Sequence, residues 1–217
     1  MQTKDTEWLV NQIAHALRNP VFAASLQAEL LVTKCLDPAA EKVLVTLRRL
    51  DAIISEMLLF GRPADVKAQE LDPAGLLQEV INAYRRSGDH EPAEIDLRLP
   101  DSQSRVAWDR HAVQLILERL LDNAVENSSP PHHIEVLLRR SSDSDIEIRV
   151  VDQGEGIPEE IRRGIFLPFF PQHEGRAGLG LAVCLKFARA LGGDLELSSE
   201  VGRGTEACVR LPVKMPS

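Results

Sequence analysis

The spacing of apolar residues changes once along this chain, and that change constrains the fold more than any other feature. Over the first 60 residues, apolar side chains recur every three to four positions, the period of an α-helix that buries one face. From Leu71 onward, stretches of alternating apolar and polar residues are interspersed with further helical segments. The sequence therefore predicts an α+β protein, with a helical N-terminal region followed by a mixed α/β region.

Two long amphipathic helices are expected before residue 60, and each carries one apolar stripe. The stripes are Ile13, Ala16, Leu17, Pro20, Ala24, Ala28 and Leu31 in the first helix, and Val43, Leu47, Leu50, Ile54, Met57 and Leu58 in the second. Leu36, Asp37 and Pro38 predict a tight turn between them, with Pro38 at the first helical position. Two such helices cannot bury both faces in one hairpin, so we expect a homodimer that forms a four-helix bundle.

Residues 61–63 (GRP) are predicted to end the second helix. A polar linker over residues 63–70 then separates a first domain, 1–62, from a second, 71–217. In the second domain helices are expected at 76–86, at 110–126 with Asp109 as N-cap, and at 179–191. Strands are expected at 95–99, 134–138, 146–150, 195–197 and 207–211. Together these elements predict a layered sheet with helices on one face.

Charge and cysteine content exclude several classes of protein. A net charge of −8 argues against a nucleic-acid surface, which needs clustered Lys and Arg. Cys35, Cys184 and Cys208 are widely spaced and form no CxxC pair, so we expect reduced thiols and a cytoplasmic location. The sequence shows no signal peptide, and no apolar run approaches the roughly 18 residues of a membrane span. We expect no membrane contact by this segment.

A polar column is predicted on the helix at 110–126. Arg119, Asn123 and Asn127 follow one another at i, i+4 spacing, so their side chains share one face. An apolar stripe of Val113, Leu117, Leu120 and Ala124 lies beside the column. This arrangement suits a helix that flanks a pocket, although a solvated helix edge would show the same pattern.

The segment directly after the strand at 146–150 reads VDQGEGIP, residues 151–158. A carboxylate at the end of a strand, here Asp152, can accept a hydrogen bond from an exocyclic amine. Glycines at 154 and 156 allow the backbone to approach a planar base closely. A simple turn after a strand is the alternative interpretation.

Two glycine-rich segments follow. Residues 175–181 (GRAGLGL) run into a helix, where free backbone N–H groups and the helix dipole favour phosphate groups. A flexible loop would have the same composition. Residues 202–205 (GRGT) predict a hairpin turn between the last two strands.

In this order the four segments resemble the N, G1, G2 and GxGT boxes of the ATP domain of histidine kinases, part of the gyrase–Hsp90–kinase–MutL superfamily. Residues 165–170 (IFLPFF) resemble the F box of the same domain. The resemblance covers about residues 70–213. It implies an α/β sandwich of the Bergerat type that binds ATP and Mg²⁺.

The resemblance assigns the base end of the nucleotide to the segments at 151–158 and 202–205. Asp152 would accept a hydrogen bond from the adenine amino group, helped by Thr205 through water. Gly154, Gly156 and Ile157 would form the base pocket.

The phosphate end is assigned to the helix at 110–126 and to the segment at 175–181. Asn123 would ligate Mg²⁺, with Asn127 nearby. Gly178, Leu179 and Gly180 would contact the phosphates.

Two features depart from the family pattern at this end. Arg119 stands where family members carry Asn, and a guanidinium cannot ligate a cation, though it can pair with phosphate oxygens. The lid that would order over the nucleotide, residues 170–178, is atypical at 171–173 (PQH).

The segment at 13–20 (IAHALRNP) resembles the H box of the dimerisation and phosphotransfer domain. Helical periodicity places His15 on the face away from the apolar stripe, with Asn19 one turn further on and Arg18 nearby. A neutral imidazole is a competent nucleophile toward a γ-phosphate near neutral pH. The resemblance implies that Asn19 positions water, and that an acidic residue, the base in the family, follows the histidine; here that residue is Ala16.

Two functions follow from the resemblance. The first is a two-component histidine kinase that phosphorylates His15 and transfers the phosphoryl group to an aspartate of a response-regulator receiver domain. The second is a degenerate transmitter that binds nucleotide or partner proteins without efficient kinase activity, because Ala16 and Arg119 depart from the pattern. An ATPase of the gyrase or MutL kind is disfavoured, because Arg119 occupies the position of its general base.

Overall fold

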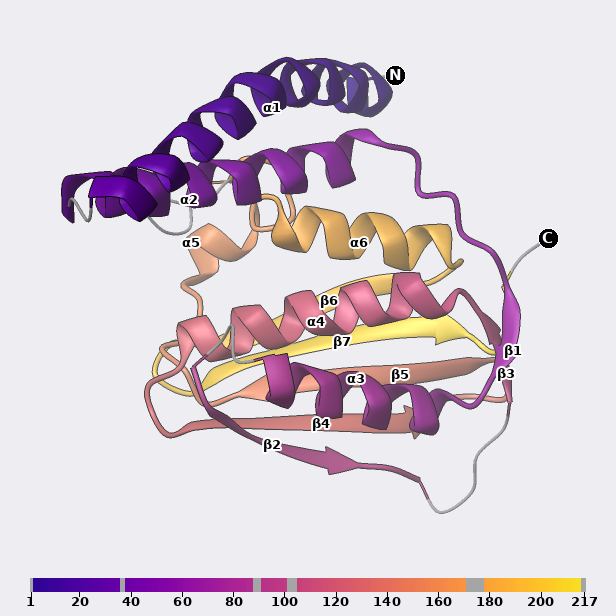
Figure 1. Cartoon of the computed structure of the whole chain (residues 1–217). Coiled ribbons are helices and arrows are strands. Elements are labelled where there is room, and N and C mark those ends of the chain that lie inside the picture. The colour runs from indigo at the N-terminus through magenta and orange to yellow at the C-terminus, as the bar shows by residue number, and fades with distance from the viewer. Residues whose placement is uncertain (1, 36–37, 88–90, 101–104, 171–177, 216–217) are drawn as a thin grey trace. The chain divides into compact units, whose positions relative to one another are not determined.

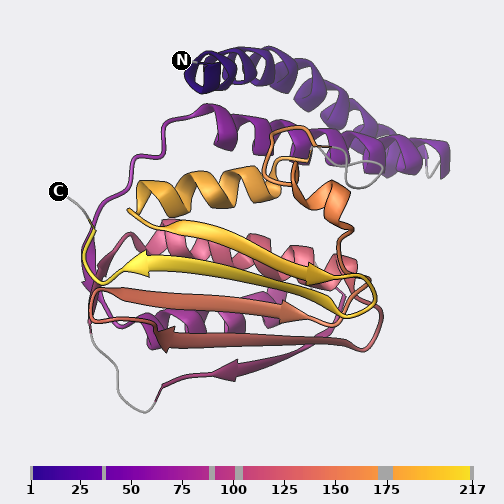
Figure 2. The same ribbon diagram turned by 180° about the vertical axis from the view of Figure 1, so that it is seen from behind.

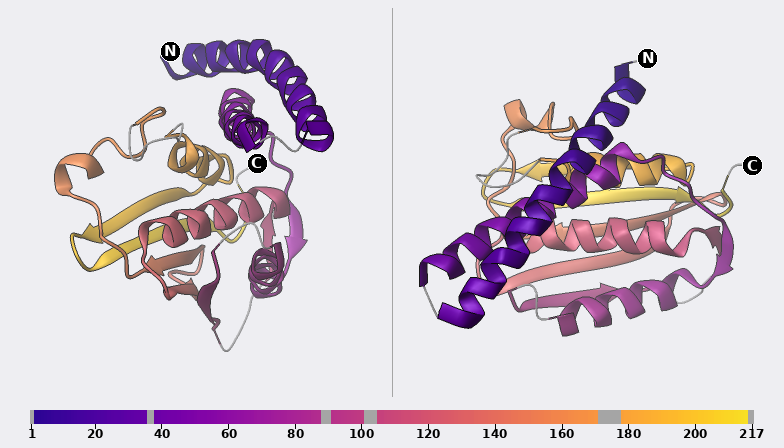
Figure 3. Two further views of the ribbon diagram at one scale, coloured as in Figure 1. Left: turned by 60° about the vertical axis from the view of Figure 1, so that its left-hand side comes forward. Right: turned by 45° about the horizontal axis from the view of Figure 1, so that its top comes forward.

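Two long helices, α1 (Gln2–Cys35) and α2 (Pro38–Gly61), pack side by side as a hairpin (Figure 1). In this computed structural model the described residues are 2–35, 38–87, 91–100, 105–170 and 178–215, without the side chains of residues 2–5, 34, 35 and 38. Pro20 lies inside α1, which curves along its length (Figure 3). Pro38 begins α2 and Gly61 ends it, as predicted, while Leu36 and Asp37 of the predicted turn lie outside the described residues.

A small core holds the hairpin together. Ala14 is fully buried against Ile54 and Leu58. The helices approach closely at Gly61, where a Cβ atom would lie 2.7 Å from the Cβ of Asn11. The contact line on α1 is therefore made largely of small residues, which permit a short distance between helix axes.

The large residues of the apolar stripe predicted on α1 are exposed, although Ala28 of the same stripe is buried. The buried residues of α1 are Val10, Ala14 and Ala28, whereas Ile13, Leu17 and Leu31 of the stripe are 43%, 45% and 54% exposed. On α2, Leu44, Ile54 and Leu58 are buried, and Val43 and Leu50 are exposed. The packing of α1 on α2 follows the small residues rather than the large ones, so the large ones lie on the surface of the single chain.

The chain divides into two compact units. The helical unit comprises residues 1–63 and 167–183, and the sheet unit comprises residues 64–166 and 184–217. The sheet unit is built on five strands: β2 (Ala93–Arg98), β4 (His132–Arg140), β5 (Asp145–Asp152), β6 (Asp194–Glu200) and β7 (Gly204–Pro212). Their order in the sheet is β2-β4-β5-β7-β6, with β2 and β4 parallel and the other neighbours antiparallel (Figure 2).

Helices α3 (Pro73–Ser87) and α4 (Arg110–Asn127) cover one face of this sheet (Figure 1). Helix α6 (Gly180–Ala190) belongs to the sheet unit from Cys184, whose Sγ lies 3.9 Å from the carbonyl oxygen of Ile116 in α4. Apolar side chains of the strands and helices form the core between them, among them Leu77, Ile81, Leu117, Leu121, Ile134, Val136, Ile148 and Val209. The layered sheet with helices on one face is confirmed.

The predicted helices and strands of this unit are all present, and Asp109 caps α4 by accepting a hydrogen bond from the backbone N–H of Ala112 at 2.9 Å. Three features were not predicted: the antiparallel pair β1 (Gln69–Leu71) and β3 (Val106–Trp108), the parallel pairing of β2 with β4, and the short helix α5 (Glu159–Arg162). Among the described helices, none combines the length and the apolar character needed to cross a bilayer.

Glu147 alternates along β5 with the core residues Ile146 and Ile148, so it lies on the sheet face away from α3 and α4, where it is 3% exposed. Its carboxylate accepts hydrogen bonds from Arg139 and Arg149 at 2.7 and 2.8 Å, and Arg210 lies 3.5 Å away. Burial alone would raise the pKa of Glu147, but the bonds from Arg149 and Arg139 outweigh it and lower the pKa to about 2. These ion pairs join β4, β5 and β7 across this face.

Candidate functional site

The last turn of α4 and the loop after β5 are in direct backbone contact. The N–H of Glu155 donates to the carbonyl oxygen of Asn127 at 3.1 Å. A Cβ atom on Gly154 would lie 2.0 Å from the same oxygen, so only glycine allows this approach. The side chain of Asn127 donates to the carbonyl oxygen of Asn123 one turn earlier, at 2.6 Å. The two motifs predicted to meet around a ligand therefore form one surface.

Asp152, the last residue of β5, is 7% exposed and presents a carboxylate at the end of the strand. Its Oδ1 accepts hydrogen bonds from the backbone N–H groups of Gly154 at 2.8 Å and Thr205 at 3.1 Å. Burial raises the pKa of Asp152, and the two N–H bonds offset part of that rise. A carboxylate held in this way is a fixed hydrogen-bond acceptor.

The turn between β6 and β7 closes the other side of the loop. The hydroxyl of Ser199 accepts from the N–H of Ile157 at 2.8 Å and lies 2.9 Å from the hydroxyl of Thr205. At Gly156, φ is +72° and a Cβ atom would lie 2.1 Å from the carbonyl oxygen of Glu200. The loop is thus fixed between α4 on one side and the β6–β7 turn on the other.

The polar column on α4 has a mixed character. The Nδ2 atom of Asn123 is buried and has no hydrogen-bond partner within the described part of the chain. An orphaned buried amide of this kind suits contact with a bound polar group. One turn earlier, Arg119 lies 4.0 Å from the carboxylate of Asp122, which also accepts a hydrogen bond from Tyr84 at 3.1 Å. Arg119 is therefore directed toward an acid on its own helix.

The glycine-rich segment before α6 lies in the helical unit. Gly178 has a φ of +62°, and a Cβ atom there would lie 2.1 Å from the carbonyl oxygen of Phe170. Leu179 is fully buried, whereas a Cβ atom on Gly180, the first residue of α6, would meet no atom within 4 Å. Most of the predicted lid, residues 171–177, lies outside the described residues.

The H-box residues also lie in the helical unit, on α1. His15, Arg18 and Asn19 are all exposed. Ala14, directly before the histidine, is buried against α2. The imidazole of His15 is therefore accessible from solvent, as the helical periodicity predicted.

The structure thus brings seven predicted residues together in the sheet unit through the contacts above: Asn123, Asn127, Asp152, Gly154, Gly156, Ile157 and Thr205. The other six, His15, Arg18, Asn19, Gly178, Leu179 and Gly180, belong to the helical unit. In the described ranges no group of three or more His, Cys, Asp or Glu side chains forms a metal site.

Sequence reasoning missed two residues of this region. Ser199 lies opposite Thr205 in the β6–β7 pairing, and that hairpin register is the signal that could have identified it. His132, which no sequence pattern singles out, is 3% exposed and has Ser128 and Glu91 as partners for its two ring nitrogens. These partners are 4 and 41 residues away, and the longer separation gives no local pattern.

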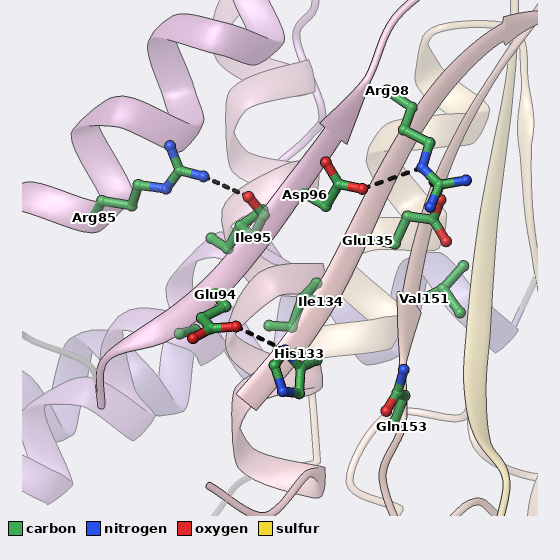
Figure 4. A pocket seen from close by; sticks show the side chains of 11 residues that line it. Arg85, Glu94, Ile95, Asp96, Arg98, His133, Ile134, Glu135, Val151 and Gln153 are labelled. Carbon is green, nitrogen blue, oxygen red and sulfur yellow. Dashed lines mark hydrogen bonds and ion pairs between the residues drawn. The ribbon is translucent and has the colours of Figure 1, made fainter. Parts of the chain in front are cut away.

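A separate hollow of about 750 Å³ lies along β2 and β4 and reaches Gln153 (Figure 4). The charged groups that line it pair with one another: Glu94 with His133 at 2.9 Å, and Asp96 with Arg98 at 3.1 Å. Arg85 reaches over the edge strand to the carbonyl oxygen of Ile95. These pairings offset much of the charge that lines the hollow.

Two family models match the chain. Residues 9–65 match the His Kinase A (phospho-acceptor) domain, and residues 108–215 match the histidine kinase-, DNA gyrase B- and HSP90-like ATPase. The first match contains the exposed histidine of α1, and the second contains α4, the loop after β5 and the β6–β7 turn. The chain belongs to the family of sensor histidine kinases.

Named relatives agree with this assignment. Sporulation kinase D of Bacillus subtilis (strain 168) is 29% identical over 210 residues, covering 94% of this chain and 41% of that protein. Signal transduction histidine-protein kinase AtoS of Escherichia coli (strain K12) is 29% identical over 209 residues, covering 94% of this chain and 34% of that protein. The chain therefore spans less than half the length of these relatives.

The fold is also shared with a solved structure. The crystal structure of full-length ShkA in complex with AMPPNP matches with a TM-score of 0.78 and 22% identity, covering 98% of this chain and 47% of that one. The predicted α+β architecture, a helical hairpin followed by an α/β nucleotide-binding fold, is confirmed by this similarity.

Proposed function

We propose that this chain is the transmitter core of a two-component histidine kinase: it binds ATP in the sheet unit and transfers the γ-phosphoryl group to His15. The observation that carries the proposal is the buried carboxylate of Asp152, held by the N–H groups of Gly154 and Thr205 beside the last turn of α4. This is the place where the nucleotide-binding motifs of the family converge.

At the base end, Asp152 would accept a hydrogen bond from the adenine amino group. The pKa of Asp152 is raised because burial disfavours its charged form. An N–H donor from the ligand would stabilise the carboxylate and offset part of that free-energy cost. Backbone atoms of Gly154 and Gly156 would contact the planar base, and Ile157 would supply apolar surface. The hydroxyl of Thr205, next to that of Ser199, would hold a water molecule between base and protein.

At the phosphate end, the amide of Asn123 fits a bound polar group, because its Nδ2 atom is buried without a partner among the described residues. Asn123, with Asn127 nearby, would hold Mg²⁺ through its amide oxygen. When bound, the cation supplies neutralisation of phosphate charge. Gly178, Leu179 and Gly180 would contribute backbone N–H groups at the start of α6, where the helix dipole favours an anion.

The phosphoryl transfer would use the exposed imidazole of His15. A ring nitrogen would attack the γ-phosphorus, the bond to the β-phosphate oxygen would break, and ADP would leave. The proton of the attacking imidazole would pass to solvent, because the next residue, Ala16, offers no base. Arg18 would pair with phosphate oxygens, and Asn19 would position water for removal of the phosphoryl group from a partner.

The exposed side chains of α1 support a homodimer. Ile13, Leu17 and Leu31 leave a line of large apolar surface on the single chain, and a second copy would bury it in a four-helix bundle. The domains proposed are residues 1–62 for dimerisation and phosphotransfer, 63–70 as linker, and 71–217 for ATP binding. A receiver domain of a response regulator would accept the phosphoryl group, and both partners would meet in the cytoplasm.

The experiment that tests the proposal is incubation with γ-labelled ATP and Mg²⁺. We expect the chain to become labelled, and we expect the label to be stable in base and labile in acid. The variant His15→Gln should carry no label. His111→Gln, which removes another exposed histidine, serves as the matched control and should keep the label. Nucleotide binding without label in the parent chain would instead support the degenerate transmitter.

A further inference from the structure

Three neighbouring strands change from apolar to polar residues at the same end of the sheet, on the face that α3 and α4 cover. Each strand places every second side chain on that face. The three rows are Ile148, Val150 and Asp152 in β5, Val209, Ala207 and Thr205 in β7, and Leu195, Leu197 and Ser199 in β6. Their last members, Asp152, Thr205 and Ser199, are here called the polar row.

The polar row is connected from strand to strand. Ser199 and Thr205 are register partners in the β6–β7 pairing, and their hydroxyl oxygens lie 2.9 Å apart. The backbone N–H of Thr205 donates to Oδ1 of Asp152 at 3.1 Å. Ser199 is therefore joined through one residue to the carboxylate of the candidate nucleotide site.

Ser199 also joins the two loops that border this site. Its hydroxyl accepts a hydrogen bond from the N–H of Ile157 at 2.8 Å and donates to the carbonyl oxygen of Gly204 at 2.9 Å. Its own carbonyl oxygen accepts a hydrogen bond from Arg162 of α5 at 3.0 Å. One half-buried serine thus contacts the loop after β5, the β6–β7 turn and α5.

The chemistry of the polar row bears on the choice of base. Adenine presents an amino donor beside a ring-nitrogen acceptor, whereas guanine presents a carbonyl acceptor beside an N–H donor at the same edge. An ionised Asp152 can only accept, so it matches the amino group of adenine and opposes the carbonyl of guanine. The hydroxyls of Thr205 and Ser199 lie next to this carboxylate and supply the groups that can donate beside it. Buried polar groups that match one ligand and are left unpaired by another give strong discrimination.

We propose that Ser199 is a positioning residue that strengthens the preference of this site for adenine over guanine. It acts through its contact with the hydroxyl of Thr205 and through the loop that it holds at Ile157. The inference rests on the proposed function, because it requires an adenine nucleotide whose amino group meets Asp152.

The test is displacement of a fluorescent ADP analogue from the whole chain by ADP and, separately, by GDP. Ser199→Ala should bind ADP roughly threefold to tenfold more weakly, the effect of one lost hydrogen bond, with a smaller change for GDP. The ratio of the two affinities should therefore fall. Ser199→Thr, which keeps the hydroxyl, should retain the parent ratio. Ser198→Ala provides the matched control, because Ser198 is an exposed serine on the other face of β6.

Two results of this displacement test overturn the inference. The first is an unchanged affinity for ADP in Ser199→Ala. The second is an equal loss for ADP and GDP, which is what a merely structural role would give. Thr205→Val adds a test of the route: if Ser199 acts through Thr205, the double variant should lose less affinity than the two single losses predict, and fully additive losses overturn it.

Amide hydrogen exchange without nucleotide separates this inference from the proposed function. The amide of Ile157 should exchange faster in Ser199→Ala than in the parent chain or in Ser198→Ala, because its acceptor is removed. Equal exchange in the three proteins overturns the positioning role. Absence of ADP binding by the parent chain would refute the proposed function and the base preference with it, and the Ile157 amide would still decide whether Ser199 positions the loop.

Discussion

The backbone N–H of Glu155 donates to the carbonyl oxygen of Asn127 at 3.1 Å, and this single bond joins the loop after β5 to the last turn of α4. Two further contacts surround it. Gly154 packs against the same carbonyl, and the N–H of Gly202 donates to the carbonyl oxygen of Glu155 at 2.7 Å. Three segments far apart in the sequence are held together here by main-chain atoms.

Gly154→Ala tests this contact. Its Cβ atom would lie 2.0 Å from the carbonyl oxygen of Asn127 and 2.9 Å from Oδ1 of Asp152, and the closer contact is with backbone, which cannot rotate away. We expect a loss of about 1–3 kcal/mol in the free energy of unfolding, typical of overpacking, together with a loss of nucleotide binding. Calorimetry and titration with an ATP analogue measure both. Gly180→Ala is the control for stability, because the new Cβ would meet no atom within 4 Å, and this variant should unfold at or above the parent temperature. Equal losses of unfolding free energy in the two variants would contradict the prediction.

Asp152→Asn should separate stability from binding. The folded-state pKa of Asp152 is raised, so the cost of its buried charge is absent at low pH, grows as the pH rises above the ordinary aspartate range, and is complete once the folded-state carboxyl has ionised. Asn keeps an acceptor for Gly154 and Thr205 without the charge. At neutral pH we expect the variant to be more stable by about 1 kcal/mol and to bind no adenine nucleotide. A less stable variant, or one with parent affinity, would show that this carboxylate has another role.

Glu147 should make the sheet unit sensitive to acid. Its pKa is lowered from 4.5 to about 2, so its contribution is present above pH 4.5 and is lost as the pH falls toward 2. Arg139 and Arg210 are about half exposed, so solvent screening limits the contribution of this shift to about 1–2 kcal/mol. Glu147→Gln should cost a similar amount near pH 7, because Arg139 and Arg149 would then bond to a neutral amide oxygen instead of a carboxylate, and the difference from the parent should shrink toward pH 2.

Urea unfolding over this pH range measures that difference. Glu159→Gln provides the matched control, because Glu159 pairs with Arg163 only at 3.9 Å on the surface, with side chains 70% and 85% exposed. A difference between parent and Glu147→Gln that does not change with pH would contradict the prediction.

Ala16→Glu should increase the rate of phosphorylation of His15. A carboxylate directly after the exposed histidine can accept the imidazole proton, and general-base catalysis contributes on the order of 10²–10⁴ in rate. Single-turnover measurements with γ-labelled ATP give the rate. Ala23→Glu places the same charge at another exposed position of α1 and should leave the rate unchanged. Equal rates in all three proteins would show that proton removal does not limit the reaction.

Local signals predicted most of the fold and only part of the site. The cap at Asp109 and the alternation in the strands depend on near neighbours, so α4 and the five strands of the sheet could be derived from the sequence, whereas the parallel pairing of β2 with β4 could not. The contact face of α1 could not, because it depends on how closely two helices approach at Gly61. The burial of His132 and the bridge made by Ser199 also escaped prediction, since their partners come from other strands and helices.

The main-chain construction of the nucleotide pocket has a consequence for how this protein can change. Most single substitutions alter side chains and leave carbonyl and N–H groups where they are, so the main-chain contacts that join α4, the loop after β5 and the β6–β7 turn should tolerate sequence change except at their glycines. In the proposed function, phosphotransfer depends by contrast on one exposed side chain, the imidazole of His15 on α1. Replacing His15 would leave a protein of the same fold that binds ATP but transfers no phosphoryl group. Restoring the transfer would require a histidine at an equally accessible position of α1.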